Sequence, residues 1–489
     1  MQPSSAMTRR LVVVFAAMAL LLTACGTEAD EATTTEAPAE TTATTAGEEA
    51  TETTETSEPV TVEIAANAIR DGKNSAEAIW IEDYVIPTFE AQMEEQGRDV
   101  TVVFNGRGVD DEDFKAQLAL DLGSASGADI ISIDGIWVGE FAEAGYILPL
   151  SEAVGPEVDD WEGWDQVPEA VQQNMSYQGE RYGVPTGTDG RVLYFNKDLF
   201  EQAGLPTDWQ PTSWDEVLET ARALKAALPD VTPLQINAGT PMGEATTMQG
   251  YLPLLVGTGE RIYDEESETW AGATAGTQAV LEFYESIFTE ELADADLQIR
   301  QDGRDRSFQD FAAGSIAILG EGDYFWRSVV NPQEGIAPME NRDEVVGWAK
   351  IPAQTPGSGI SGQDFVSMSG GGGRVINPNT ANPAVAWELM MFINSREAIL
   401  EFLAGQARIS QRMDVNEEVL AGDPFLSYVA DEVLPLTAYR PGFAIYPQVS
   451  VLLQEASEQV ALGTSAADAA QQYQSDLEGL VGADAVTGG

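Results

Sequence analysis

Histidine is absent from this 489-residue chain, and cysteine occurs only once, at Cys25. Without histidine, the chain lacks the side chain that most often acts as a general base near neutral pH and as a metal ligand. Catalytic Ser-His-Asp and Cys-His arrangements are therefore excluded, and a single thiol cannot form a disulfide within the chain. We expect no cofactor and no metal, because zinc and copper sites depend largely on histidine and thiolate ligands.

Positive charge is also scarce. The chain has 24 Lys and Arg residues against 81 Asp and Glu residues, which gives a formal net charge of −57. A surface of this sign repels nucleic acid and anionic lipid headgroups, so neither is expected as a partner. Our hypothesis is a high-salt habitat, because dissolved salt screens the mutual repulsion of carboxylates. An acidic protein from a low-salt habitat is the alternative.

Long apolar runs are absent except near the N-terminus, where residues 11–22 follow Arg9-Arg10 and lead into Leu22-Thr23-Ala24-Cys25. A basic start, a short apolar core and small residues before a cleavage site are typical of a secretory signal peptide. The run is shorter than the roughly 20 residues that span a membrane. Because the only cysteine stands where a lipobox places the acylated residue, residues 1–25 are predicted to be a lipoprotein signal peptide, with lipidation at Cys25.

Residues 26–59 are rich in Thr, Glu and Ala and contain almost no large apolar side chain. Such a segment cannot bury enough surface to offset its loss of conformational entropy, so it is predicted to be a disordered acidic tether. Two acyl chains give a stable membrane anchor. The remaining chain is therefore expected outside the bacterial cytoplasmic membrane and attached to its outer face.

The first part of the body alternates between extended and helical patterns. Strands are expected at residues 61–65, 100–104 and 129–133. Between them, apolar side chains recur at helical spacing over residues 79–93 and 114–122. Strands that alternate with helices indicate a parallel sheet with helices on both faces, which is the α/β fold class.

A second alternating set begins near Arg191. Residues 192–195 and 234–237 are expected to be strands, and a capping box at Ser213-Trp214-Asp215-Glu216 is expected to open a helix. Further helices are expected at residues 278–288, 383–394, 447–462 and 466–480. The chain is therefore predicted to contain two α/β units.

A series of short blocks gives a more specific signal. The blocks are Tyr182-Gly183-Val184-Pro185, Leu193-Tyr194-Phe195-Asn196-Lys197-Asp198-Leu199-Phe200, Gly204-Leu205-Pro206, Thr212-Ser213-Trp214, and the stretches 129–137, 144–150, 311–318 and 382–389. In this order they resemble the extracellular solute-binding proteins of ABC importers, family 1, the maltose-binding-like group that binds sugars. The resemblance extends from about Val60 to the C-terminus.

The resemblance implies a periplasmic-binding-protein fold with two lobes, each a mixed, mainly parallel sheet flanked by helices, joined by a hinge. We expect residues 60–189 and 351–408 in the first lobe, and residues 190–350 and 409–489 in the second. A sugar or oligosaccharide is expected in the cleft between the lobes, which close over it. The protein is expected to be a monomer that delivers the solute to an ABC permease and its ATPase, without chemistry on the solute.

The candidate ligand-binding residues follow strands, because ligands of open α/β sheets meet the loops at the carboxyl ends of strands. Carboxylates, amides and guanidinium groups bind sugar hydroxyls, and aromatic rings stack on sugar C–H faces. The candidates in the first lobe are Asn67, Arg70, Asp71, Arg107, Asp134 and Trp137. Those in the second lobe are Asn237, Glu321, Asp323 and Tyr324.

The resemblance adds three candidate residues. Asp189 matches a polar cleft position, Tyr446 matches an aromatic position that often faces the sugar, and Arg412 is a further match. Structural roles compete with these functions, since an Asp after a strand often caps a helix and Trp137 can pack inside its lobe.

Two other functions remain open. A polyamine or another small solute also meets carboxylates and aromatic rings, so it stays an alternative ligand for the same fold. A membrane-anchored glycoside hydrolase needs only a pair of carboxylates. With 81 acidic residues, such pairs arise by chance and carry little information.

Overall fold

The computed structural model describes residues 58–488, except for the side chain of Glu112. The predicted signal peptide, Cys25 and nearly all of the predicted tether lie outside the described residues. Within residues 58–488, no helix combines the length and the apolar character that crossing a membrane requires.

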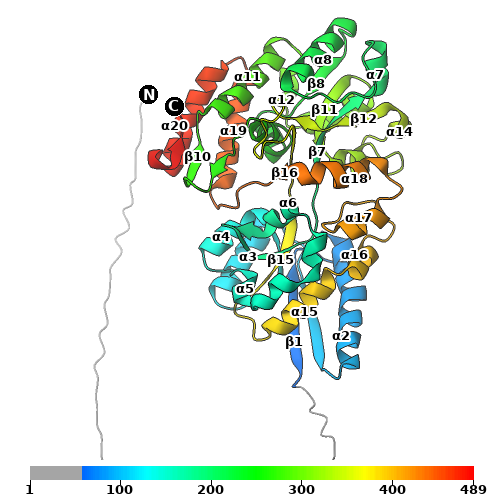
Figure 1. Ribbon diagram of the computed structural model, residues 1–489, viewed down its shortest axis with the longest axis vertical. Coiled ribbons are helices and arrows are strands. Elements are labelled where there is room, and N and C mark those ends of the chain that lie inside the picture. Colours follow the sequence, from blue (N-terminus) through cyan, green and yellow to red (C-terminus); the bar gives the residue numbers. More distant parts are fainter. Residues whose placement is uncertain (1–57, 489) are drawn as a thin grey trace, which may run out of the picture. The chain divides into compact units, whose positions relative to one another are not determined.

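The first sheet has five strands in the order β2-β1-β3-β15-β6. Figure 1 labels β1 and β15 of this sheet. Its strands are β1 Val60–Ala66, β2 Val100–Gly106, β3 Ile130–Asp134, β6 Gly183–Pro185 and β15 Gly372–Ile376. β1 is parallel to β2 and β3, whereas β15 is antiparallel to β3 and β6. The mixed, mainly parallel sheet predicted for the first lobe is confirmed.

The second sheet has four strands in the order β12-β7-β11-β8. They are β7 Arg191–Asn196, β8 Thr232–Gln235, β11 Ile316–Gly322 and β12 Val346–Ala349. β8 and β11 are parallel, and β7 is antiparallel to both β11 and β12. This sheet therefore repeats the plan of the first, with one antiparallel strand inside a parallel set.

The two antiparallel strands have a common cause. β7 begins at Arg191 and β15 at Gly372, and in the sheets these residues pair with Gly322 and Asp134, the last residues of β11 and β3. Each strand therefore enters its sheet at the edge where the parallel strands end. A chain that arrives from the other lobe at this edge can only run back against its neighbours.

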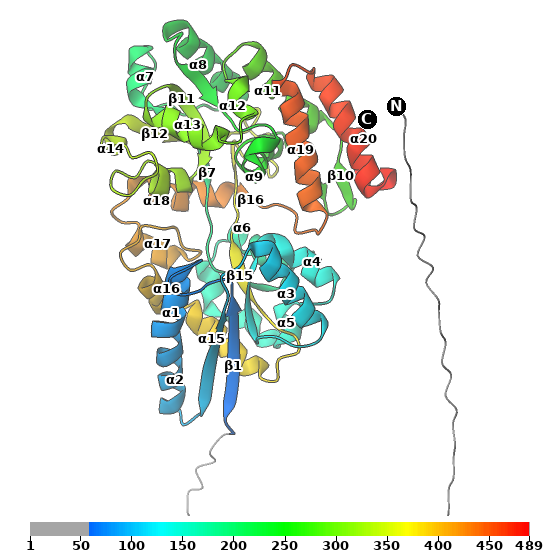
Figure 2. The ribbon, with the colours of Figure 1, turned by 180° about the vertical axis from the view of Figure 1, so that it is seen from behind.

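Helices cover both sheets (Figures 1 and 2). Those of the first lobe are α1 Ser75–Trp80, α2 Ile86–Glu95, α3 Asp111–Gly123, α4 Val138–Glu143, α5 Leu150–Ala153, α6 Glu169–Gln172, α15 Pro383–Ile393 and α16 Arg396–Phe402, on which α17 Met413–Val419 packs. Those of the second are α7 Lys197–Gln202, α8 Trp214–Ala227, α9 Glu244–Thr246, α10 Leu252–Gly257, α11 Ala275–Thr289, α12 Ala295–Gln298, α13 Gly303–Ala312, α14 Arg342–Val345, α18 Pro424–Tyr428, α19 Tyr446–Ala461 and α20 Ala466–Val481. α11, α19 and α20 pack on one another.

Short strands complete the structure. β13 Ile351–Pro352, β14 Phe365–Met368 and β16 Thr437–Ala438 form a three-stranded sheet. β9 Tyr263–Asp264, β10 Thr269–Ala271 and β17 Val486–Thr487 form another, and β4 Ser176–Tyr177 pairs with β5 Glu180–Arg181.

Two predicted helices show how local sequence determines where a helix begins and where it is interrupted. Ser213 accepts a hydrogen bond from the Glu216 amide at 3.3 Å, and Glu216 Oε2 accepts one from the Thr212 amide at 2.7 Å, which confirms the predicted helix start. The single helix expected over residues 79–93 is instead divided by a π-helical turn, Ile81–Val85. Pro87 lies just after this turn, and its missing N–H prevents a regular α-helical ladder there.

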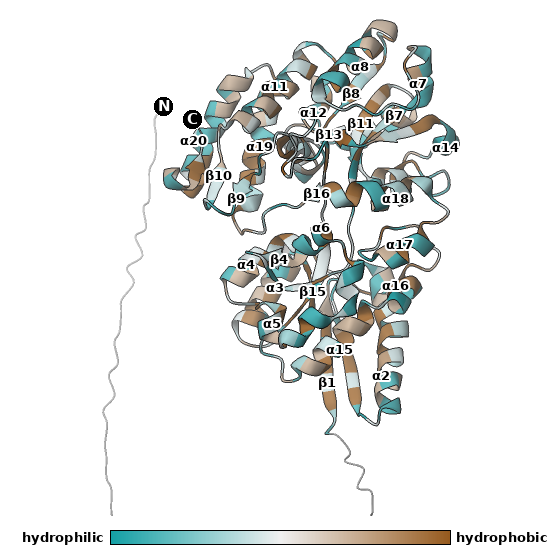
Figure 3. Ribbon diagram, in the orientation of Figure 1, coloured by the Kyte–Doolittle hydropathy of each residue, from teal (hydrophilic) through white to brown (hydrophobic). Residues whose placement is uncertain are grey.

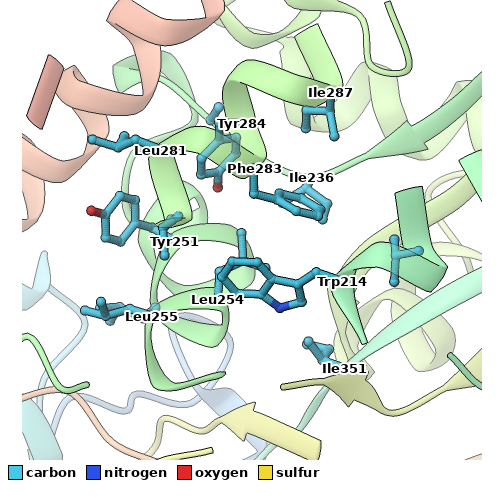
Figure 4. Close-up of a cluster of buried hydrophobic side chains, with 14 of the residues drawn as sticks. Trp214, Ile236, Tyr251, Leu254, Leu255, Leu281, Phe283, Tyr284, Ile287 and Ile351 are labelled. Atoms are coloured by element: carbon cyan, nitrogen blue, oxygen red, sulfur yellow. The ribbon is translucent and has the colours of Figure 1, made fainter. Parts of the chain in front are cut away.

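Hydrophobic side chains gather on the strands, for example along β1 (Figure 3). The core of the second lobe contains Trp214, Leu254 and also Ile351 (Figure 4). Val366 and Met368 belong to the same core. The structure therefore differs from the expected crossing at residue 351. Because these apolar side chains bury in the second core, the chain leaves that lobe only after Met368 and enters the first lobe at β15.

Candidate ligand-binding site

A cavity of about 360 Å³ lies in the first lobe, where β3 ends and β15 begins. Four aromatic residues line it, Trp80, Phe114, Trp137 and Phe402. Its polar lining is Asn67, Asn74, Glu77, Asp111, Ser132, Asp134, Thr186, Arg374, Asn394, Arg408, Ser410 and Gln411. Aromatic faces beside carboxylates, amides and guanidinium groups are the surroundings that a polyhydroxylated ligand requires.

Asp134 ends β3 and lies in this cavity. Its Oδ1 accepts a hydrogen bond from the Ile136 amide at 3.1 Å, so it caps the short helical turn that follows. Burial raises the pKa of the Asp134 carboxyl, and the positive charge of Arg440 in the second lobe acts against this shift. Asp134 therefore combines the cap with a place in the cavity wall.

Arg374 and Ser132 form the floor beside Asp134, on the same face of the sheet. They are directly opposite each other on β15 and β3. Arg374 donates to Glu77 at 2.7 Å, and its guanidinium carbon lies 5.6 Å from the centre of the Trp80 ring. Arg374 Nε and Ser132 Oγ are both buried and have no hydrogen-bond partner among the described residues.

Arg408 reaches the cavity from the third crossing between the lobes. Arg408 is exposed to solvent, and no carboxylate among the described side chains lies within ion-pair distance of it. Desolvation by the surrounding walls lowers the pKa of the Arg408 guanidinium, while the charges of Asp323, Glu77 and Asp189 act in the opposite direction. Arg408 thus lies between charged groups of both lobes.

Asn67 and Asp111 hold the rim of the cavity. Asn67 donates to Val109 O at 3.0 Å and to Asp111 Oδ1 at 2.9 Å, and it accepts from the Val109 amide at 3.1 Å. Asp111 also pairs with Lys73 at 2.8 Å. These contacts tie the loop after β1 to the start of α3.

The edge of the second sheet is different in character. Glu321, whose side chain is fully buried, receives two hydrogen bonds of 2.8 Å from Arg304. Asn237, also fully buried, donates to Glu321 at 3.2 Å and accepts from Gln235 at 3.3 Å. These side chains satisfy one another within the lobe.

Asp323 follows β11 at the same edge and is 2% exposed. Its Oδ2 accepts from Arg327 at 3.2 Å, whereas its Oδ1 is buried without a partner among the described residues. Burial raises the pKa of Asp323 to about 6, and the nearby charge of Asp189 contributes to the shift.

Tyr446 belongs to the second core, at 1% exposure, rather than to an open wall. Its hydroxyl donates to Glu244 at 2.8 Å. Glu244 also accepts from Arg440 at 3.0 Å and from Ser450 at 2.6 Å. Tyr446 therefore positions a partly exposed carboxylate.

Asp189 lies where two crossings between the lobes run side by side. It accepts hydrogen bonds from the Arg191 guanidinium and, at 2.8 Å, from the Gly370 amide. Burial by itself raises the pKa of Asp189, but the charges of Arg191 and Arg440 and the Gly370 amide outweigh it, so the pKa lies below its ordinary value. Asp189 links the hinge segments to each other.

A model of the bacterial extracellular solute-binding proteins matches residues 73–399. The chain belongs to this family. As a solute-binding protein, it has the family and the two-lobed fold that the sequence blocks predict, and it is assigned to the extracytoplasmic side of the membrane.

Curated relatives of this solute-binding protein match only part of it. A binding protein of Brucella abortus is 32% identical over 110 residues, which is 22% of this chain and 25% of the relative. The sn-glycerol-3-phosphate-binding periplasmic protein UgpB of the same species is 26% identical over 194 residues, which is 37% of this chain and 40% of the relative. The chain thus matches less than half the length of these relatives.

Solved structures share the fold over a larger part of the chain. An ABC transporter solute-binding protein from Thermotoga lettingae, bound with α-D-tagatose, is 24% identical with a TM-score of 0.59, covering 86% of this chain and 100% of its own. The cyclic α-maltosyl-1,6-maltose binding protein of Arthrobacter globiformis is 19% identical with a TM-score of 0.66, covering 87% and 100%.

Three residues predicted from the sequence line the cavity of this solute-binding protein, namely Asn67, Asp134 and Trp137. The other ten candidates do not line it. Asp189, Asn237, Glu321, Asp323 and Tyr446 have the contacts described above. Arg70 pairs with Glu82 and Asp83 on the surface, and Asp71 and Arg107 are exposed. The Arg327 guanidinium lies over the Tyr324 ring, and Arg412 forms a two-bond pair with Asp414.

Strand-end reasoning missed Glu77, Trp80, Arg374 and Arg408. Glu77 and Trp80 lie on α1, and Arg374 lies inside β15 rather than after it. A search for charged residues within an apolar strand would have found Arg374. No sequence signal brings Arg408 to the cavity, because the crossing segment places it there.

Proposed function

We propose that this protein is the lipid-anchored receptor of an ABC importer, which captures a sugar or oligosaccharide between its lobes and delivers it to a membrane permease. The observation that carries the proposal is the first-lobe cavity, where Trp80, Trp137 and Phe402 stand beside Asp134 and Arg374. Tagatose in the Thermotoga relative and the cyclic maltosyl-maltose of the Arthrobacter relative support this class of ligand.

In this proposal, the receptor binds and releases the solute without changing it chemically. The first lobe offers the open polar groups, and closure about the hinge at Asp189 brings the second-lobe edge onto the solute. Contacts that only the closed state completes drive closure. The permease and its ATPase then receive the solute, and the protein acts as a monomer without a catalytic step.

The predicted signal peptide over residues 1–25, lipidation at Cys25 and the tether over residues 26–59 complete the proposal, although residues 1–57 lie outside the described residues. The tether lets the lobes reach the permease while the anchor keeps them near the membrane. Replacing Cys25 with alanine is expected to move the protein from the membrane fraction to the medium.

The test is a ligand screen on the full-length protein, purified from membranes in detergent. Sugars, oligosaccharides, polyamines and sn-glycerol 3-phosphate are compared by thermal shift, because a ligand that binds only the folded state raises the melting temperature. A shift with a sugar that is recovered intact supports the receptor. A shift with a polyamine alone would contradict the ligand class, and recovery of a cleaved sugar would make the protein a hydrolase.

A further inference from the structure

Two of the three carboxylates that line the first-lobe cavity are already paired with cations. Glu77 pairs with Arg374 at 2.7 Å, and Asp111 pairs with Lys73 at 2.8 Å. Asp134, the third, has no ion pair among the described residues, and burial raises the pKa of its carboxyl. Desolvation of Asp134 therefore disfavours its negative charge.

Arg408 is the cation of this cavity that remains unpaired. It lines the same cavity, and it has no ion pair and no side-chain hydrogen bond with the residues whose side chains the structure describes. Across the cleft, Asp323 and Asp189 already pair with Arg327 and Arg191. Arg107 and Arg261 also have no ion pair among the described residues, but both lie outside the cavity, so Arg408 is the unpaired arginine that lines it.

The floor of the cavity supplies further donors. Arg374 is 3% exposed, and its Nε has no hydrogen-bond partner among the described residues. Ser132 Oγ, directly opposite on β3, is also unpartnered. Buried polar groups that lack partners cost free energy, so they mark places where an acceptor is expected.

We propose that the solute bound in this cavity carries an anionic group, a carboxylate or a phosphate monoester, and that Arg408 and Arg374 donate to it. The guanidinium fork matches the oxygen geometry of both groups. The remaining carboxylates and the aromatic walls then hold the hydroxyls and the C–H face of the same solute. This inference rests on the proposed function and narrows its ligand from sugars in general to acidic or phosphorylated sugars and polyols.

The experiment compares matched ligands that differ only in charge. Full-length protein is titrated by calorimetry with glucose, glucuronate and glucose 6-phosphate, with galactose and galacturonate, and with glycerol and sn-glycerol 3-phosphate. At least one anionic member is expected to bind about tenfold or more tightly than its neutral partner. The carboxylate and phosphate arms show which anion is recognised.

Variants of Arg408 test whether the preference for anionic over neutral ligands arises in the cavity. Arg408→Gln is expected to reduce the anionic-to-neutral affinity ratio by about tenfold, and Arg408→Lys is expected to restore part of it. Arg261→Gln is the matched control, because Arg261 is exposed, has no ion pair among residues 58–488 and lies outside the cavity. The melting temperature of each variant shows that it is folded.

Three results would overturn the inference. If a neutral sugar binds more tightly than its acid or phosphate ester, the proposed receptor function stands, but the solute does not carry the inferred anionic group. An equal loss of affinity for neutral and anionic ligands in Arg408→Gln assigns Arg408 to lobe closure, in contact with Asp323, instead of to ligand recognition. Binding of polyamines alone contradicts the inference and the proposed function together.

Discussion

The two sheet edges of this protein differ in how completely their polar groups are satisfied. At the first, Ser132 Oγ, Arg374 Nε and Arg408 surround a cavity and lack partners among the described residues. At the second, Glu321 and Asn237 are fully buried and bonded to their own lobe, and Asp323 Oδ1 is buried without a partner among the described residues. Under the proposed function, the first lobe provides the open binding surface, and the second provides a wall whose polar groups are mostly bonded to one another. Substitutions should therefore affect binding at one edge and stability at the other.

The largest effect is expected at the second edge. Glu321→Ala leaves Arg304 and Asn237 without their shared acceptor and should lower the free energy of unfolding by about 3–5 kcal/mol. The measurement is urea denaturation, with Glu291→Ala as control, since the Glu291 side chain is 85% exposed in its pair with Lys225. The control should change stability by less than about 1 kcal/mol. A similar, small change in both variants would remove the contrast between the edges.

Asp323 makes the stability of the second edge depend on pH. Burial raises its pKa from 3.8 to about 6, so the folded protein holds this proton more tightly than the unfolded chain. Its contribution is present in full below about pH 4 and is lost as the pH rises through 6. Asp323→Asn cannot ionise and should be more stable than the wild type at pH 7, by up to roughly 3 kcal/mol.

The Asp323 prediction is checked by thermal denaturation of both proteins at several pH values. The difference in melting temperature should shrink as the pH falls from 7 to 4. A difference that is constant with pH would mean that Asp323 ionises in the folded protein as readily as in the unfolded chain.

At the first edge, Asp134→Ala should reduce ligand affinity by about 10- to 100-fold, the value of a hydrogen bond to a charged group. The loss of its cap should lower stability by only about 1 kcal/mol. Tyr446→Phe is the counterpart in the second lobe, because it removes the hydroxyl bond to Glu244 inside the core. Tyr446→Phe should leave the ligand affinity measured by calorimetry nearly unchanged. A loss of affinity in Tyr446→Phe but not in Asp134→Ala would exchange the roles of the two lobes.

The smallest effect is expected outside both edges. Arg70 forms exposed pairs with Glu82 and Asp83 and does not line the cavity. Arg70→Ala should therefore change stability by less than about 1 kcal/mol and leave ligand affinity unchanged. A clear loss of affinity in the same titrations would return Arg70 to the binding site, as the strand-end rule first suggested.

Local patterns predicted most of the elements correctly. The strands β1, β2, β3 and β7 and the helix α8 lie where apolar periodicity and the Ser213 capping box indicate. The break in the first long helix was missed, because the effect of Pro87 depends on the turn before it.

The rule that ligands meet the ends of strands identified only part of the cavity lining. Asp134 and Trp137 line it, since the carboxyl end of β3 meets the crossing segments there. Asn237 and Glu321 were predicted by the same reasoning and Tyr446 by the family resemblance, yet all three are buried in networks of their own lobe. A strand end indicates which edge a residue lies on, but packing decides whether its polar atoms remain open.

The sequence by itself determined the family, the α/β class and the two sheets, because apolar periodicity and the motif blocks depend on neighbours along the chain. Only the tertiary structure decided that Ile351 belongs to the second core and that Arg408, beside Arg374, has no ion pair among the described residues. Three crossings bring distant segments together at the cleft, and charge compensation there depends on distances in space, which spacing along the chain does not contain.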